Sequence, residues 1–234
     1  GKTIGIIGYG HIGTQVGVIA EALGMQVLFH DIEAKLSLGN ARAAAGLDDL
    51  LARSDIVTLH VPETPATQGM FGAAQIARMK PGAHLINASR GTVVDIDALA
   101  AAMKSGHVGG AAVDVFPVEP QGNADVFASP LVGLDNALLT PHIGGSTLEA
   151  QDNIGLEVAA KLIRYSDNGS TLSAVNFPEV TLPEHTGSTR LLHIHRNVPG
   201  VLSQVNEVFS RLGVNIDGQF LRTHAKVGYV VIDI

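Results

Sequence analysis

The chain contains no cysteine among its 234 residues. That absence excludes disulfides, thiolate metal sites and a cysteine nucleophile. No apolar run approaches the ~20 residues that a membrane-spanning helix needs. No basic start followed by an apolar segment marks a signal peptide either. We therefore expect a soluble, globular protein of the cytoplasm.

Basic residues are few, and they are scattered along the chain. Lysine and arginine number 15 against 22 aspartates and glutamates, which gives a formal charge of -7, and no basic run occurs. A nucleic-acid-binding protein needs a concentrated basic face, so we expect no nucleic-acid partner. The ten histidines form no HExxH or comparable set, and we expect no metal site.

A glycine-rich turn, GYGHIG at residues 8–13, follows a strand-like run at residues 3–8. In such a turn the glycines permit a tight bend, a close approach of the backbone to a pyrophosphate, and packing of the next helix on the strand. A coincidental glycine-rich turn is the alternative. However, a second apolar run at 26–30 ends in Asp31, where a carboxylate would bind the adenosine ribose and repel a 2'-phosphate. The pattern predicts NAD rather than NADP.

The first 145 residues alternate short apolar runs with amphipathic segments. Strands are predicted at residues 3–8, 26–30, 55–61, 83–87, 109–115 and 136–140. Helices are predicted at residues 11–23, 47–53, 73–79 and 96–105. Several of the strands are continuously apolar, as expected where both faces of a sheet are covered. The alternation predicts an α/β fold with a doubly wound parallel sheet.

A different pattern begins at Ser146, where Ser146 and Glu149 have the spacing of a helical capping box. This helix is predicted to run to about Tyr165, and the proline-containing stretch 176–187 reads as a linker. Further elements are predicted as a strand at 191–195, a helix at 201–212, and strands at 218–223 and 229–234. The predicted domains are residues 1–145, a helix and linker at 146–186, and a third segment at 187–234.

Three loops that follow predicted strands carry Arg90, Glu119 and His142. Ligands collect at the carboxyl ends of such strands. His142 suits a general base, because the unperturbed pKa of histidine is about 6.5. Glu119 could accept the other ring N–H, and Arg90 could hold a carboxylate by two parallel hydrogen bonds. Singly these residues could be a solvated histidine, a surface turn and a salt bridge, but together they indicate NAD-dependent alcohol oxidation.

Five motifs carry a resemblance to a known family. They are GYGHIG (8–13), SDIVTLHVPETPAT (54–67), MKPGAHLINASRG (79–91), AAVDVFPVEP (111–120) and LLTPHIGGST (138–147). Through about residue 166 the chain resembles the D-2-hydroxyacid dehydrogenase family, and residues 191–234 resemble an ACT regulatory domain. The resemblance implies a Rossmann-type doubly wound parallel sheet followed by a truncated ACT domain of ferredoxin-like α+β type. We therefore expect a fragment, cut within the ACT domain and lacking most of a substrate domain.

The resemblance also implies roles for individual residues. The catalytic residues would be Arg90, Glu119 and His142. The cofactor contacts would be Gly8, Gly10, His11, Ile12, Gly13, Asp31, Ala88, Ser89, Arg90, Asp114, His142 and Gly145. A serine effector would bind at His195, Asn197 and Asn215, which without the resemblance read as one strand-surface histidine and two turn residues.

The implied activity is NAD-dependent oxidation of 3-phosphoglycerate to 3-phosphohydroxypyruvate, the first step of phosphorylated serine synthesis, with inhibition by serine. A homo-oligomer, usually a tetramer, is implied as well. Two alternatives stay open. One is another D-2-hydroxyacid dehydrogenase acting on 2-oxoglutarate or a small 2-oxo acid, and the other is a non-catalytic NAD-sensing interaction protein. We expect the fragment by itself to bind NAD weakly and to be inactive.

Overall fold

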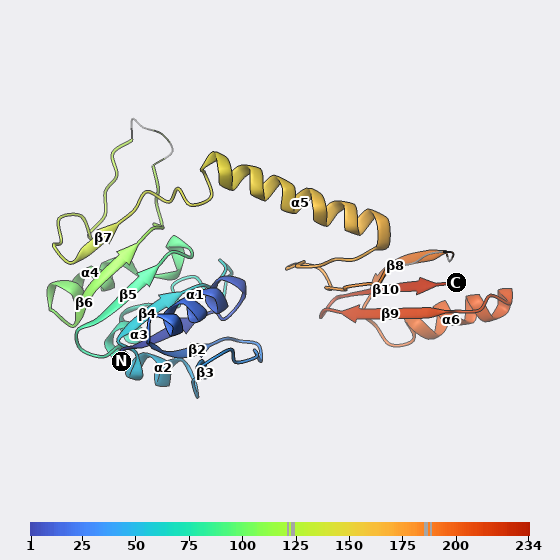
Figure 1. The fold of residues 1–234 in the computed structure, drawn as a ribbon, viewed down its shortest axis with the longest axis horizontal. Helices are drawn as coiled ribbons and strands as arrows, with labels where there is room; N and C mark the ends of the chain where they lie inside the picture. Colours follow the sequence, from blue (N-terminus) through green and yellow to red (C-terminus); the bar gives the residue numbers. More distant parts are fainter. Residues whose placement is uncertain (121, 123–124, 185–186, 188) are drawn as a thin grey trace. The chain divides into compact units, whose positions relative to one another are not determined.

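The computed structural model describes residues 1–120, 122, 125–184, 187 and 189–234. The chain forms two compact units, Gly1–Ile143 and Gly144–Ile234 (Figure 1). The predicted division into three segments, with its boundary at residue 187, stays a prediction. Among the described residues, no helix combines the length and the apolar character that crossing a membrane would require.

The first unit is a parallel sheet of seven strands in the order β3-β2-β1-β4-β5-β6-β7. The strands are β1 (Thr3–Ile7), β2 (Gln26–His30), β3 (Arg42–Ala43), β4 (Ile56–Leu59), β5 (Ala83–Asn87), β6 (Val108–Val113) and β7 (Ala137–Leu139). The helices are α1 (His11–Ala22), α2 (Leu47–Arg53), α3 (Ala73–Arg78) and α4 (Ile96–Lys104), with a short 3-10 helix η1 (Gly91–Val93). The order reverses between β1 and β4, which is where ligands bind in such sheets.

Apolar side chains fill both faces of this sheet. One cluster joins β1 and β2 to α1 and includes Ile6 and Phe29. The other joins the central strands to α2, α3 and α4 and includes Leu85 and Leu99. The predicted doubly wound parallel sheet is thus confirmed. β3 was missed because it has only two residues, both exposed, so no apolar run marks it.

The second unit begins with a long helix, α5 (Leu148–Asn168), none of whose residues is buried. Its predicted start was wrong by one residue: Thr147, not Ser146, is the N-cap and accepts a hydrogen bond from the N–H of Ala150. The predicted end near Tyr165 was three residues short. The helix instead runs to Asn168 and ends at Gly169, whose φ of 78° is the left-handed conformation in which helices commonly terminate.

After α5 the chain forms an antiparallel sheet in the order β8-β10-β9, with one helix in the sequence between β8 and β9. The elements are β8 (Arg190–Arg196), α6 (Val201–Leu212), β9 (Gly218–Thr223) and β10 (Val227–Asp233). The stretch predicted as a linker is packed in part: Val180 and Leu182 are buried against Tyr229 and Val231. Its prolines obscured this alternation of apolar residues in the sequence.

Arg190 ties the end of α5 to the sheet of the second unit. Its guanidinium binds both carboxylate oxygens of Asp233, at 2.6 and 2.7 Å, and donates to the carbonyls of Asn168 and Pro183. The Arg190 side chain is only 2% exposed. The phenol of Tyr229 donates to the carbonyl of Gly169, and burial raises its pKa to about 12. These bonds fix the chain that leaves the helix.

Close contacts also define the turn between β1 and α1. Gly8 has a φ of 90°, and a Cβ there would lie 2.5 Å from the carbonyl oxygen of His60. A Cβ on Gly13 would lie 2.1 Å from the carbonyl oxygen of Gly8. At Gly10, by contrast, no other described atom would come within 4 Å of a Cβ. Packing therefore requires glycine at positions 8 and 13 and leaves open space at position 10.

Gly13→Ala should destabilise the protein although alanine favours helices. The new methyl group would overlap a backbone oxygen that cannot move alone, and overpacking of this kind costs about 2 kcal/mol. Gly10→Ala is the matched control and should change the free energy of unfolding by less than about 0.5 kcal/mol. Urea denaturation measures both, and equal stabilities of the two variants would contradict this account of the turn.

Arg190→Met should lower the free energy of unfolding by about 3 kcal/mol, because it leaves the partly buried carboxylate of Asp233 without its cation. Lys161→Met is the control, since Lys161 pairs with Glu157 on the exposed surface of α5 and such pairs contribute less than about 1 kcal/mol. The check is a urea denaturation curve of each variant. A midpoint for Arg190→Met equal to that of the control would show that the ion pair is dispensable.

Candidate active site

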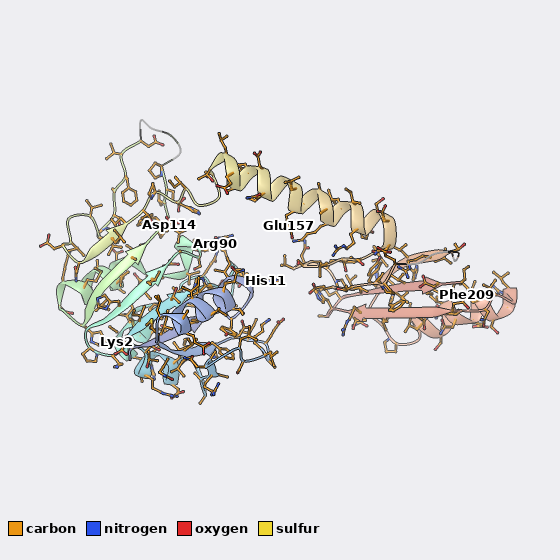
Figure 2. All side chains as sticks on the ribbon, in the orientation of Figure 1. Lys2, His11, Arg90, Asp114, Glu157 and Phe209 are labelled. Carbon is orange, nitrogen blue, oxygen red and sulfur yellow. The ribbon has the colours of Figure 1, made fainter. Side chains whose placement is uncertain are left out.

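The loops that carry the predicted functional residues lie at the carboxyl edge of the parallel sheet. In Figure 2 Arg90, Asp114 and His11 lie at the same edge of the first unit, whereas Lys2, which precedes β1, lies at the opposite edge. Parallel strands all end at one edge, so residues distant in sequence meet there.

His142 and Glu119 form a hydrogen-bonded pair. Nδ1 of His142 lies 2.9 Å from Oε2 and 3.0 Å from Oε1 of Glu119. Partial burial raises the pKa of Glu119, but hydrogen bonds from His142 and from the N–H of Phe116 outweigh it and hold this pKa below its ordinary value. An ionised Glu119 favours the tautomer with the proton on Nδ1. Nε2 is then the ring atom that can accept a proton.

Asp114 fixes the backbone that presents His142. Its Oδ1 accepts hydrogen bonds from the hydroxyl of Thr140, at 2.5 Å, and from the N–H of His142, at 3.1 Å. His142 has a φ of 52°, a left-handed conformation that few residues other than glycine adopt. Such a conformation persists when the surrounding structure stabilises it. The hydrogen bond from the N–H of His142 to the carboxylate of Asp114 contributes to that stabilisation. Its predicted contact with the cofactor stays a prediction.

The loop after β5 places Arg90 at the surface and Ser89 inside. The Arg90 side chain is exposed, and its NH1 group donates to the carbonyl of Ser89 at 2.7 Å. Ser89 is only 6% exposed, and its hydroxyl donates to Asn87. Ala88 is exposed. Contacts of a cofactor with this loop therefore suit the exposed Ala88 and Arg90 better than the hydroxyl of Ser89.

The turn beside Asp31 has the features that an NAD pyrophosphate and ribose need. No described side chain caps the first turn of α1, so its leading N–H groups can meet phosphate oxygens. His11 and Ile12 are exposed there, and Gly10 faces open space. Asp31 accepts hydrogen bonds from the N–H of Tyr9 at 2.7 Å and of Glu33 at 2.9 Å. Each oxygen keeps a lone pair for a ribose hydroxyl.

A cavity of about 600 Å³ lies beside the His142–Glu119 pair and is lined largely by apolar residues. Phe116 and Phe127 form part of its wall, with ring centroids 4.7 Å apart in an edge-to-face arrangement. Neither phenylalanine was predicted to belong to the site. Their positions within the loop were the available signal, since a large aromatic residue in an exposed loop commonly has a packing or binding role.

The residues predicted for the serine effector lie in the second unit. His195 on β8 is partly buried over Gly228, and its Nδ1 has no hydrogen-bond partner among the described residues. Asn197 donates to the carbonyl of His224 at 2.9 Å, and Asn215 donates to Asp217 at 3.3 Å. Each asparagine thus has a local partner, and the effector site stays a prediction.

Two further expectations concern residues outside this cluster. Gly145 belongs to the second unit, where its carbonyl accepts a hydrogen bond from Gln151, and its cofactor contact stays a prediction. Over the described ranges, no three histidine, aspartate or glutamate side chains are grouped so that they could hold a metal ion.

Comparisons with known proteins agree with this geometry. Over 234 residues the chain is 67% identical to D-3-phosphoglycerate dehydrogenase of Escherichia coli (strain K12), a match that covers 100% of this chain and 57% of that protein. A glyoxylate reductase structure from Paecilomyes thermophila matches 75% of this chain and 52% of its own, with a TM-score of 0.64 and 34% identity. An NAD complexed D-isomer specific 2-hydroxyacid dehydrogenase from Lactobacillus delbrueckii ssp. bulgaricus has a TM-score of 0.65 and 31% identity, over 75% of this chain and 56% of its own.

Family models match both units. Residues 191–234 match the AHAS small subunit-like ACT domain, and the observed order β8-α6-β9-β10 fits the expected ACT-like fold. The chain spans less than two thirds of the length of the relatives named above. Residues 1–144 match the NAD binding domain of D-isomer specific 2-hydroxyacid dehydrogenases. The first unit is thus a Rossmann-type NAD-binding domain, and the chain belongs to the D-isomer specific 2-hydroxyacid dehydrogenase family.

Proposed function

We propose that this chain supplies the NAD-binding and proton-transfer part of an enzyme that oxidises 3-phosphoglycerate to 3-phosphohydroxypyruvate. The observation that carries the proposal is the His142–Glu119 pair at the carboxyl edge of the sheet, next to Asp114. The choice of substrate is supported by the 67% identity to the Escherichia coli phosphoglycerate dehydrogenase. The ACT-like unit favours it over another 2-hydroxyacid as the substrate.

His142 and Arg90 would act on the substrate. Nε2 of His142 accepts the proton of the C2 hydroxyl as the C2–O bond becomes a carbonyl, and Glu119 stabilises the imidazolium that forms. The guanidinium of Arg90 holds the carboxylate of the substrate by parallel hydrogen bonds. NAD, held by the turn at residues 8–13 and by Asp31, would supply the acceptor for the hydride of C2, so that the products would be a 2-oxo acid, NADH and a proton.

The cofactor would be held by the turn at residues 8–13, by the start of α1 and by Asp31. The negative charge of Asp31 would repel the 2'-phosphate of NADP, and this repulsion would select NAD. Further contacts of the cofactor are proposed at Ala88, Ser89, Arg90, Asp114 and Gly145.

Serine is the proposed effector of the ACT-like unit, at His195, Asn197 and Asn215. Nδ1 of His195 is buried without a hydrogen-bond partner among the described residues, so a polar effector that reached it would supply the missing bond. We also propose a homotetramer, in which edge strands of neighbouring ACT-like units pair and the effector site is shared between two chains.

Function is tested in a chimera in which these 234 residues replace the matched part of the Escherichia coli relative. We expect the chimera to form NADH from 3-phosphoglycerate, and His142→Ala to lower kcat by about 100-fold or more, since a general base contributes at least that much. His84→Ala, an exposed histidine at the start of β5, should leave kcat unchanged. Equal rates for His142→Ala and the parent would place the base elsewhere.

Glu119→Gln in the same chimera should cost less than His142→Ala and should change the pH profile. The variant removes the negative charge that favours the imidazolium. The acidic limb of the kcat/KM profile for oxidation should therefore move to lower pH. An unmoved limb would mean that Glu119 does not act through His142.

Asp31→Asn should narrow the preference for NAD over NADP in the chain itself. It removes the repulsive charge but keeps one oxygen as an acceptor. We expect weaker NAD binding and stronger NADP binding, with the difference between the two binding free energies reduced by about 1 to 3 kcal/mol. Isothermal titration with each cofactor measures both affinities. An unchanged ratio would exclude Asp31 as the selecting residue.

Asn197→Ala in the chimera should weaken inhibition by serine and leave the uninhibited rate unchanged, because Asn197 lies far along the chain from the NAD-binding unit. The serine concentration for half inhibition is the quantity to measure. The same value for variant and parent would count against Asn197 as an effector ligand.

A further inference from the structure

Asn87, the last residue of β5, is completely buried although its side chain is polar. Its Nδ2 donates to the carbonyl of Arg90 at 3.1 Å. Its Oδ1 accepts from the N–H of Ser89 at 3.1 Å and from the hydroxyl of Ser89 at 2.8 Å. The amide thus uses its oxygen and one of its two N–H groups to close the loop that carries Arg90. Hydrogen-bonded polar groups in the interior rigidify the structure around them.

The backbone of Asn87 extends this connection to the next loop. Its carbonyl accepts the N–H of Asp114 at 2.9 Å, and Oδ1 of Asp114 accepts the N–H of His142 at 3.1 Å. Asn87 therefore connects two segments. Its side chain binds the segment of Arg90, and its backbone binds Asp114, which in turn binds His142.

The residue after Arg90 packs against the loop that follows β6, the loop to which Asp114 also belongs. A Cβ on Gly91 would lie 2.1 Å from the backbone of Phe116, so the two backbones pack directly on each other. The N–H of Phe116 in turn holds Glu119 at 2.9 Å. The segment of Arg90 is therefore anchored twice, by Asn87 on one side and by the backbone of Phe116 on the other.

We propose that Asn87 is a positioning residue for carboxylate recognition: it fixes the backbone from which Arg90 reaches the substrate. The inference rests on the proposed role of Arg90. The Arg90 side chain is exposed, and its NH1 group donates to the carbonyl of Ser89, the residue whose N–H and hydroxyl both donate to Asn87. Asn87 is buried and does not touch the substrate. It acts by holding the backbone of Arg90 at a fixed position relative to His142. A misplacement of a substrate-binding group by about 1 Å can lower the rate 100-fold.

The test is a double-mutant cycle between Asn87 and Arg90 in the chimera. Asn87→Asp keeps the size and the Oδ1 acceptor but replaces the donor to Arg90 by an oxygen. We expect kcat/KM for reduction of 3-phosphohydroxypyruvate by NADH to fall about 10- to 100-fold, mostly through KM. In an Arg90→Ala background the same change should cost less than about threefold, because the side chain that it positions is gone. A purely structural role would give the same loss in both backgrounds.

Asn40→Asp is the matched control, because Asn40 makes the same kind of bridge elsewhere. Its Nδ2 donates to the carbonyl of Met25 at 2.8 Å and its Oδ1 accepts the N–H of Val27 at 3.2 Å, at the amino end of β2. This variant should lose stability without a change in KM. NADH binding by each variant, followed by fluorescence titration, verifies that it is folded. Asn87→Ser, which is neutral and too short to reach Arg90, replaces Asn87→Asp if the latter does not fold.

The outcomes separate the two proposals. If Arg90→Ala retains the parental kcat/KM, the role of Arg90 in the proposed function fails, and the inference about Asn87 fails with it. If Arg90→Ala is impaired but both Asn87 variants have parental KM values, or if their losses add fully to that of Arg90→Ala, the inference alone is overturned.

Discussion

The hydrogen bond between Nδ1 of His142 and the carboxylate of Glu119 determines what the rest of the site can do. An imidazole beside an ionised carboxylate presents Nε2 as its acceptor. At 2.9 Å the bond also fixes the plane of the ring. The surrounding loops matter because they hold this pair. Asp114 accepts the N–H of His142, and Phe116 donates to Glu119. The site is thereby organised before any ligand arrives, which is how catalytic geometry lowers a barrier.

The parallel sheet explains why three separate segments can form one site. β5, β6 and β7 are neighbours in the sheet and run in the same direction, so the loops that follow them leave from a common edge. Asp114, in the loop after β6, accepts a hydrogen bond from Thr140 in the loop after β7. The N–H of Asp114 donates to the carbonyl of Asn87 at the end of β5. Direct backbone contact at Gly91 completes the arrangement. The residues proposed for proton transfer and for carboxylate binding therefore share a single hydrogen-bonded support.

Local patterns predicted the sheet and the pairing of His142 with Glu119, whereas features set by distant packing were missed. Continuous apolar runs and the glycine turn are visible in sequence, so β1, α1 and β2 were predicted within one residue. The role of Asn87 was missed because nothing local separates a buried asparagine at the end of a strand from a solvated one. Val180 and Leu182 were assigned to a linker, since their burial depends on Tyr229 about fifty residues later.

The protonation of His142 in the chain itself tests the central claim most directly. A long-range proton–nitrogen NMR spectrum distinguishes the two ring tautomers of each neutral histidine, and a spectrum of His142→Gln identifies the signals of His142. The account predicts the proton on Nδ1 and an unprotonated Nε2, with this preference weakened in Glu119→Gln. A neutral His142 with its proton on Nε2, or a tautomer unaffected by the loss of the Glu119 carboxylate, would contradict it.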